Sequence, residues 1–200
     1  MAVLNEYKVA INAFATEWDA AEKAVKQAEL IDAVAVISSI LELRYAGRRF
    51  VEALNKIAAD GSQAEIEALL QDAKFDCHRA RHDAIDALTS KIALDLDLMC
   101  NKLGYDAILK AYPNFITFSN KLSEIQERIA EARKARQNRE AIYTSLEVNE
   151  YEDLVKEFKV LRRAEPIMKS LARRERLISW GGLTIGIIGV LAGIVIAYFD

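Results

Sequence analysis

Residues 4–28 read LNEYKVAINAFATEWDAAEKAVKQA, and their apolar side chains recur at alternating steps of three and four positions. The members of this series are Leu4, Tyr7, Ile11, Phe14, Trp18, Ala21, Val25 and Ala28. A heptad spacing of this kind places all of them on one face of an amphipathic helix. The sequence therefore predicts that the chain begins with a long helix packed against other helices.

The heptad phase slips near Asp32, where the chain enters a broader apolar stretch from Leu30 to Leu41. The regular spacing returns between Leu43 and Ile57, with Gly47 on the same face. A slip alters the local supercoil or lets a third helix pack, and a glycine on the seam indicates a close helix contact or a bend. This pattern allows one helix, or two that join at Gly47, and the run 60–62 (DGS) ends it.

Further helical runs follow. After Ser62, a predicted N-cap, an apolar stripe recurs at helical spacing through Ile66, Leu70, Ala73, Cys77, Ala80, Ala84 and Leu88. Residues 92–98 (IALDLDL) also alternate with the period of a strand, but the helical spacing continues to Leu103, so we expect helix there. A short piece at 105–112 and a third long helix at 118–132 come next.

The last helix is expected to start at Asn149, after a break at 145–149. Asn149 and Glu152 have the spacing of a capping box. Pro166 is expected to kink this helix, because proline lacks a backbone N–H and clashes with the preceding turn.

Composition supports a helical fold. The 200 residues include only two prolines, and five of the eight glycines lie in the last twenty positions. A β-sandwich, a barrel or an α/β enzyme needs more turn residues than this. The predicted fold class is all-α, with long antiparallel helices in a bundle or coiled-coil-like arrangement and a single C-terminal transmembrane helix.

Residues 177–199 read LISWGGLTIGIIGVLAGIVIAYF and contain no charged side chain. A helix of this length extends roughly 34 Å at about 1.5 Å per residue, enough to cross a hydrocarbon core of about 30 Å. Trp180 and Tyr198 lie near its two ends, where aromatic side chains favour the headgroup layer. We therefore expect a transmembrane helix at 177–199 and a lipid bilayer as a partner.

A basic juxtamembrane segment at 166–176 precedes this run, and the cations begin slightly earlier. They are Arg162, Arg163, Lys169, Arg173, Arg174 and Arg176, and with two glutamates they give a local charge of +4. Basic flanks remain on the cytoplasmic side and attract anionic lipids. Residues 1–165 are therefore expected to form a cytoplasmic helical bundle, in a single-pass, tail-anchored topology with Asp200 on the far side.

Small residues form a continuous stripe within the apolar run: Ser179, Gly182, Gly186, Gly189, Gly193 and Ala197. Two G-x-x-x-G pairs lie on this stripe. Lipid offers no hydrophobic drive for helix association, so close backbone approach is what lets such helices pair. We expect the chain to form a homo-oligomer through this face, and a protein partner of the helical domain is also possible.

Chemistry-bearing motifs are scarce. The sequence has no phosphate-binding glycine loop, zinc-protease motif or nucleophile elbow. His78, His82 and Asp86 recur at steps of four on one predicted helix face, a spacing that suits a divalent metal. A metal also needs a ligand from a second helix, and the neighbouring Arg79 and Arg81 disfavour a cation. We expect a solvent-facing polar stripe, no catalytic, metal or cofactor site, and no enzymatic activity.

Two further classes are disfavoured. Residues 128–139 (RIAEARKARQNR) contain five cations, but no aromatic residue is interleaved for base stacking and the sequence pI is about 5.6, so nucleic acid is an unlikely partner. The N-terminal residues lack the apolar core of a signal peptide, and no arginine precedes Arg44, so we expect no secretory or mitochondrial leader. Two cysteines without a C-x-x-C pair favour a reducing compartment.

Two functions fit these features. The first is a non-enzymatic, tail-anchored membrane protein whose helical cytosolic domain is an oligomerising scaffold or interaction module. The alternative resembles α-helical pore-forming proteins, such as toxins or effectors, in which a soluble helical body conceals an apolar segment until it inserts and oligomerises. A pore needs a polar lining, and this run offers only Ser179 and Thr184. In the concealed form, the stretch from Leu30 to Leu41 is the candidate cover.

Overall fold

A computed structural model of the chain is helical throughout the part that it describes. It describes the backbone of residues 6–134 and 136–199, and the side chains of residues 6–134, 137–147 and 150–178. Every element within this backbone is a helix, and no strand occurs in it. The predicted all-α fold class is therefore confirmed for the described residues.

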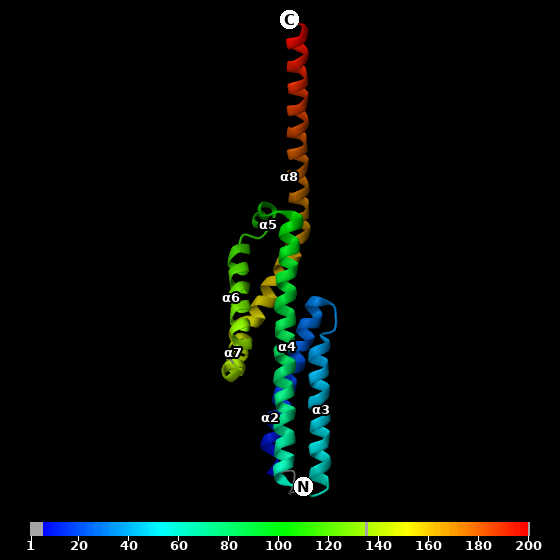
Figure 1. The fold of residues 1–200 in the computed structure, drawn as a ribbon, viewed down its shortest axis with the longest axis vertical. Helices are drawn as coiled ribbons and strands as arrows, with labels where there is room; N and C mark the ends of the chain where they lie inside the picture. Colours follow the sequence, from blue (N-terminus) through cyan, green and yellow to red (C-terminus); the bar gives the residue numbers. More distant parts are fainter. Residues whose placement is uncertain (1–5, 135, 200) are drawn as a thin grey trace. The chain divides into compact units, whose positions relative to one another are not determined.

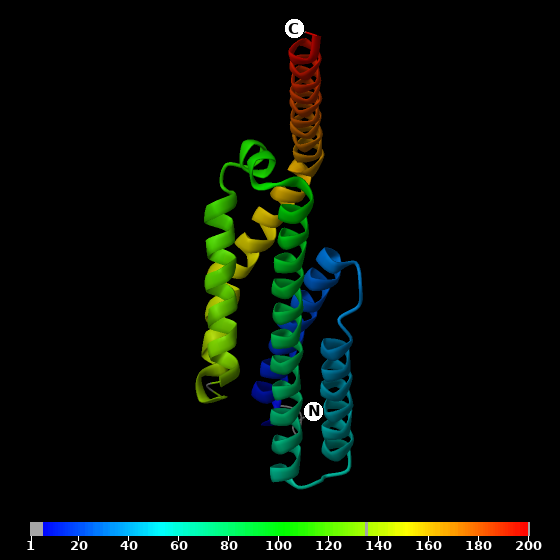
Figure 2. The ribbon, with the colours of Figure 1, turned by 45° about the horizontal axis from the view of Figure 1, so that its top comes forward.

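Three long helices come first in the chain: α2 (Lys8–Asp32), α3 (Ile37–Ala58) and α4 (Gln63–Leu103). Short connections join them, so that successive helices run antiparallel (Figures 1 and 2). The first break lies at residues 33–36, where the heptad phase slips, and Ala33 there takes a left-handed backbone conformation with φ of 57°. The alternative of one continuous helix, or of a joint at Gly47, is thus wrong.

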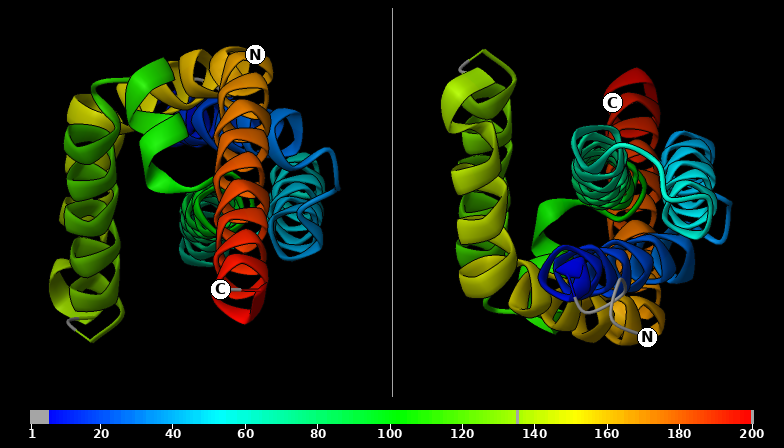
Figure 3. Two further views of the ribbon diagram at one scale, coloured as in Figure 1. Left: turned by 90° about the horizontal axis from the view of Figure 1, so that it is seen from above. Right: turned by 90° about the horizontal axis from the view of Figure 1, so that it is seen from below.

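Helices α2, α3 and α4 lie side by side in the end-on views (Figure 3), and small side chains fill part of their shared core. Ala21, Ala46 and Ala80 are fully buried in this core. The rings of Phe14 and Phe50 stack there with their centroids 4.4 Å apart. Gly47 lies inside α3, and a Cβ at this position would come within 3.6 Å of the Trp18 ring. The glycine on the seam thus faces Trp18 of α2, at a distance where a Cβ would make an ordinary van der Waals contact.

The predicted stripe of α4 forms the core. Its seven members, Ile66, Leu70, Ala73, Cys77, Ala80, Ala84 and Leu88, are each at most 2% exposed. Burial raises the pKa of the Cys77 thiol to about 12, so this cysteine behaves as a small apolar side chain. Residues 92–98 are helical, so the strand-like alternation there reflects a helix with a buried face.

The rest of the chain comprises α5 (Tyr105–Ala111), α6 (Phe115–Lys134), the 3-10 helix η1 (Arg136–Asn138), α7 (Arg139–Leu146), the π-helix η2 (Glu147–Tyr151) and α8 (Glu152–Phe199). The predicted break at 145–149 and the N-cap at Asn149 are wrong, because the backbone stays helical from α7 into α8. A π-helical turn inserts an extra residue into a helix. Here it lets Leu146 and Tyr151 both remain buried.

The chain divides into two compact units. Unit 1 comprises the residues up to Asp95 together with Leu122–Asp153, and unit 2 comprises Leu96–Lys121 together with Leu154–Asp200. Helices α4 and α6 each contribute to both units. The aromatic rings of Tyr112 and Phe118 meet edge to face in unit 2, with 6.5 Å between their centroids. The boundaries predicted after residues 165 and 176 fall inside α8.

Several predictions concern side chains outside the described set. They are the small-residue stripe (Ser179, Gly182, Gly186, Gly189, Gly193 and Ala197) and the aromatic pair Trp180 and Tyr198. Among the residues searched, which are the described ones, no helix combines the length and apolar character that a membrane crossing requires. The backbone of α8 continues through Pro166 to Phe199.

Large apolar side chains are exposed around the connection between α2 and α3. They are Leu30 (74% exposed), Val34 (62%), Ile37 (63%), Ile40 (40%) and Leu41 (41%). These residues form most of the apolar stretch in which the heptad phase slips. Ile31 and Val36 in the same stretch are buried (4% and 8% exposed), so the described structure of unit 1 covers only part of it.

Candidate functional site

The basic residues predicted to flank the membrane lie on α8. All six cations, Arg162, Arg163, Lys169, Arg173, Arg174 and Arg176, are exposed. The guanidinium of Arg162 lies 5.3 Å from the ring centroid of Phe158, a cation–π distance. The segment is therefore a charged surface of unit 2 and ends directly before the uncharged run.

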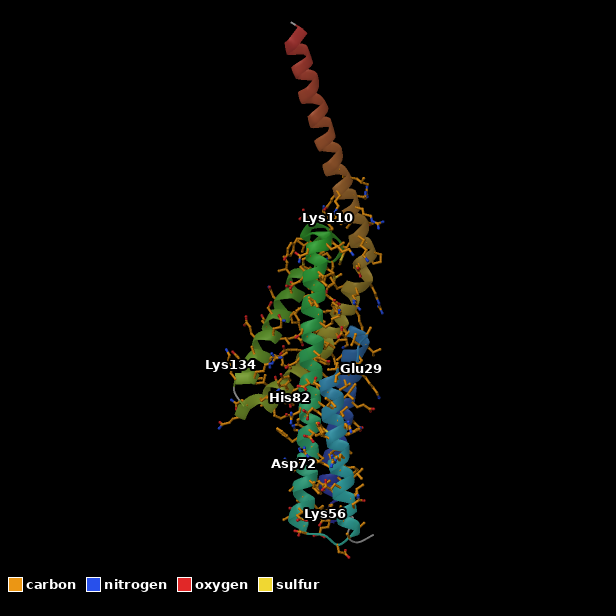
Figure 4. The ribbon with its side chains drawn as sticks, turned by 45° about the vertical axis from the view of Figure 1, so that its right-hand side comes forward. Glu29, Lys56, Asp72, His82, Lys110 and Lys134 are labelled. Carbon is orange, nitrogen blue, oxygen red and sulfur yellow. The ribbon has the colours of Figure 1, made fainter. Side chains whose placement is uncertain are left out.

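Both carboxylates in this segment are engaged by lysines. Glu165 accepts from Lys169 one turn along α8, with the two charged atoms 2.7 Å apart. Glu175 accepts from Lys110 of α5 at 2.6 Å (Figure 4). Among the described side chains neither glutamate forms an ion pair with Arg173, Arg174 or Arg176.

A cavity of about 370 Å³ lies where the end of α4 meets α8. It is lined by Lys102, Leu103, Lys169, Ala172, Arg173 and Arg176. Three of the predicted basic residues thus come together, while Arg162, Arg163 and Arg174 do not line it. Leu103 and Ala172 are 9% and 5% exposed and supply the apolar part of the wall.

Sequence reasoning missed Lys102. Its carbonyl lies in the last turn of α4, where backbone acceptors lack partners within the helix. Arg176 fills this need, because its Nη2 donates to the Lys102 carbonyl oxygen at 2.6 Å. The position of Lys102 two residues before Gly104 marks a helix end, but only the pairing of α4 with α8 brings it to the cations.

A second polar cluster lies inside unit 1 around Arg81 of α4. The Arg81 side chain is 7% exposed and contacts three glutamates from three other elements. Its Nη1 lies 3.3 Å from both Glu17 of α2 and Glu147 of η2, and its Nη2 donates to Glu140 of α7. A charge this deeply buried needs such partners to offset the loss of water.

The two histidines belong to the same cluster. Nδ1 of His78 lies 2.8 Å from Oε2 of Glu140, and its Nε2 lies 3.2 Å from Glu17. Nε2 of His82 lies 3.0 Å from the same Glu140 oxygen, and the His82 ring stacks on Tyr143 at 3.9 Å. His82 is only 4% exposed and sits midway along α4 (Figure 4). The predicted solvent-facing polar stripe is therefore wrong, because Glu140 and Tyr143 of α7 contact it.

Burial and pairing shift the pKa values of this cluster in opposite directions. Burial lowers the pKa of His82 below its usual 6.5, although Glu140 opposes the shift. Burial alone would raise the pKa of Glu140, but the hydrogen bonds from His78 and His82 and the charge of Arg81 hold it well below its usual value. Burial also raises the pKa of Glu147, against the opposing charges of Arg81 and Lys23.

Asp86 does not join the histidines. Its Oδ2 accepts from Arg133 at 2.6 Å, and its Oδ1 accepts from the hydroxyl of Tyr143 at 2.6 Å. The described residues contain no group of three or more histidines, cysteines or acidic residues arranged to hold a metal ion. The expected absence of a metal remains a prediction for the whole chain.

A cavity of about 550 Å³ opens beside this cluster. Its lining consists of Phe75, His78, Arg79, His82, Arg139 and Glu140. Arg79 is paired with Glu42 at 2.6 Å, and the guanidinium of Arg139 lies 5.7 Å from the Tyr143 ring centroid. Within this wall the two histidines contact Glu140, whereas Arg79 and Arg139 contact residues outside it.

The basic run at 128–139 makes contacts within unit 1. Arg128 donates to Ser145 at 3.0 Å and pairs with Glu150, while Arg133 pairs with Asp86. These arginines connect α6 to its neighbours, which is a structural use of the charges. The prediction that nucleic acid is not a partner is not tested by these contacts.

Comparison of the chain with family models, with curated proteins and with solved structures gives no match.

Proposed function

We propose that this chain is a non-enzymatic, tail-anchored membrane protein whose helical domain is an oligomerising scaffold or interaction module. The apolar run at 177–199 anchors it in a bilayer, and the N-terminal helices lie on the cytoplasmic side. The observation that carries the proposal is the direct succession of an exposed basic segment and 23 uncharged residues on one helix.

The start of the apolar run supports this proposal. Leu177 and Ile178 are each 73% exposed, and they directly follow the exposed Arg176. Exposed leucine and isoleucine at the beginning of a long uncharged segment are costly in water, because apolar surface prefers to leave it. A bilayer provides the apolar environment for such a segment.

The charge distribution supports the orientation. Arginines and a lysine concentrate on the N-terminal side of the run. Lysine and arginine close to a membrane span favour the cytoplasmic side. The interaction role is supported by the exposed apolar side chains at the α2–α3 connection, since such surfaces commonly mark contacts with other molecules.

The test of membrane anchoring is fractionation of cells that express the full chain, with an alkaline carbonate wash of the membranes. A matched chain that ends at Arg176 is the control. We expect the full chain to stay in the washed pellet and the shortened chain to appear in the supernatant. A stable soluble form of the full chain would contradict the proposal and favour the pore-forming alternative.

Oligomerisation has a separate test. Replacing Gly186 and Gly189 by leucine adds bulk to the small-residue stripe and should prevent close helix approach. Replacing Ile185 and Ile188 by leucine changes residues off the stripe and should have no effect. An unchanged oligomer size of the glycine variant in detergent would exclude the stripe as an interface.

A further inference from the structure

We infer that the cavity of unit 2 between the end of α4 and α8 binds the phosphate group of an anionic lipid headgroup. Its ligands are Lys102, Lys169, Arg173 and Arg176. The inference that the phosphate belongs to a lipid rests on the proposed membrane anchoring. The inference that the cavity binds phosphate rests on its lining residues alone.

The lining of the cavity is unusually basic. Four of the six residues that line its volume of about 370 Å³ are cations. This volume falls within the range of roughly 300–1,000 Å³ that is typical of small-ligand sites. None of the six lining residues is acidic, and among their described ion pairs is that of Lys169 with Glu165. Like charges around one space repel each other, and an anion between them removes that cost.

One of the lining cations, Arg176 of α8, is held by the backbone at the end of α4. Arg176 donates one N–H to the carbonyl oxygen of Lys102, and a guanidinium has five N–H donors, so others remain for a ligand. The same contact fixes α8 against the end of α4, which keeps the Lys102 side chain next to the arginines. The ligand set is therefore built by the fold and is not a simple run of basic residues along one helix.

The chemistry of the cations favours phosphate. Guanidinium groups match the geometry of phosphate oxygens with paired hydrogen bonds, and ammonium groups act as compact point charges. Four cations balance a dianionic phosphate monoester better than a singly charged carboxylate. Phosphatidic acid is the lipid headgroup with this charge.

The position of the cavity fits a headgroup. Arg176 lines the cavity and directly precedes Leu177, the first residue of the uncharged run. If the run is inserted, its cytoplasmic end lies at the level where lipid phosphates and basic side chains meet.

Binding is measured with the full chain in an uncharged maltoside detergent by isothermal titration calorimetry. The probes are short-chain phosphatidic acid, phosphatidylcholine of the same chain length, and inorganic phosphate. We expect saturable binding of one phosphatidic acid per chain and much weaker binding of phosphatidylcholine.

The variants separate the cavity from general basic charge. Lys102→Gln with Arg173→Gln removes two lining cations and should weaken phosphatidic acid binding at least about tenfold, because each is a charge-assisted contact. Arg163→Gln with Arg174→Gln removes the same charge from exposed positions outside the cavity and should leave the affinity nearly unchanged. All four side chains are exposed, and circular dichroism checks that both variants keep their helical content.

If both double variants lost the same affinity for phosphatidic acid, the binding would come from general attraction to the basic surface and not from the cavity. Binding that does not saturate would lead to the same conclusion. Binding of inorganic phosphate as tight as that of phosphatidic acid would overturn the lipid as the source and leave a phosphate site for a soluble molecule. The titration needs no bilayer, so its failure is distinct from failure of the carbonate test. If carbonate releases the chain from membranes but the chain still binds phosphatidic acid, the membrane anchor is refuted and the binding site is not.

Discussion

Arg81 in unit 1 and Arg173 in unit 2 are the same residue type in opposite electrostatic situations. Arg81 is buried and meets Glu17, Glu140 and Glu147, so its charge is balanced within the chain. Arg173 is exposed beside a cavity whose other polar lining is also cationic. Charges that pair internally stabilise one arrangement of helices. Among the four lining cations only Lys169 has a carboxylate partner in the described structure, and this excess of positive charge favours an anionic ligand.

The largest expected effect comes from Arg81→Met. It leaves three carboxylates close together without their cation, and loss of one partner of a buried ion pair typically costs about 3 kcal/mol of folding free energy. Arg173→Met should change stability by less than about 0.5 kcal/mol, as is usual for an exposed site. Urea denaturation of the full chain in maltoside, followed by circular dichroism, measures both. If the two variants were equally stable, the ion pairs of Arg81 would contribute no more to folding than the exposed Arg173.

The second-largest expected effect is a fall in the stability of unit 1 on acidification. The folded pKa of His82 is lowered, so its contribution is present above the unfolded value of 6.5 and is lost as the pH falls through the folded pKa. The pKa of Glu140 is also lowered, so its contribution is present above the unfolded value of 4.5 and is lost below it. Glu147 has a raised pKa and acts in the opposite sense, with a contribution that is lost as the pH rises.

Glu147→Gln removes the carboxyl group whose raised pKa opposes the effects of His82 and Glu140 on the pH dependence of stability. In that background the free energy of unfolding should fall steadily from neutral pH to about pH 4. Adding His82→Gln should flatten only the upper part of the curve, and urea denaturation at a series of pH values measures it. A free energy of unfolding that rises on acidification would show that the cluster does not control stability as described.

A smaller effect is expected from Tyr143→Phe. The Tyr143 side chain is fully buried, and its hydroxyl donates to Asp86 at 2.6 Å. Loss of this bond should cost about 1–2 kcal/mol, because Asp86 keeps its bond to Arg133. Tyr45 is 49% exposed, so Tyr45→Phe is the control and should be neutral. Thermal unfolding that shifts equally in both variants would argue against the Asp86 contact.

Local patterns predicted the helices well. The stripe from Ile66 to Leu88 is buried as its spacing requires, and the first break coincides with the slip of the heptad phase. The prediction failed at Asn149, where capping-box residues lie in a π-helical turn. Spacing in the sequence reports which face of a helix is apolar, but not whether the next helix begins with a break or continues the last one.

The candidate sites were predictable only in part. The six basic residues on α8 are evident from the sequence because they adjoin the apolar run. Lys102 is not evident, since it lies 67 positions before Lys169 and reaches the cavity only through packing of α4 against α8. The contact of His82 with Glu140 has the same origin, because charges 58 positions apart meet only when α7 covers α4.

We propose that residues 177–199 lie in a bilayer while unit 1 stays outside it, and the chain contains one tryptophan in each region. Trp18 packs in the core of unit 1, and Trp180 belongs to the uncharged run. The measurement is tryptophan fluorescence of Trp18→Phe and Trp180→Phe chains in vesicles whose lipids are brominated on their acyl chains. We predict quenching in the chain that retains Trp180 and none in the chain that retains Trp18. Unquenched fluorescence in both, or quenching of Trp18, would contradict the membrane anchor.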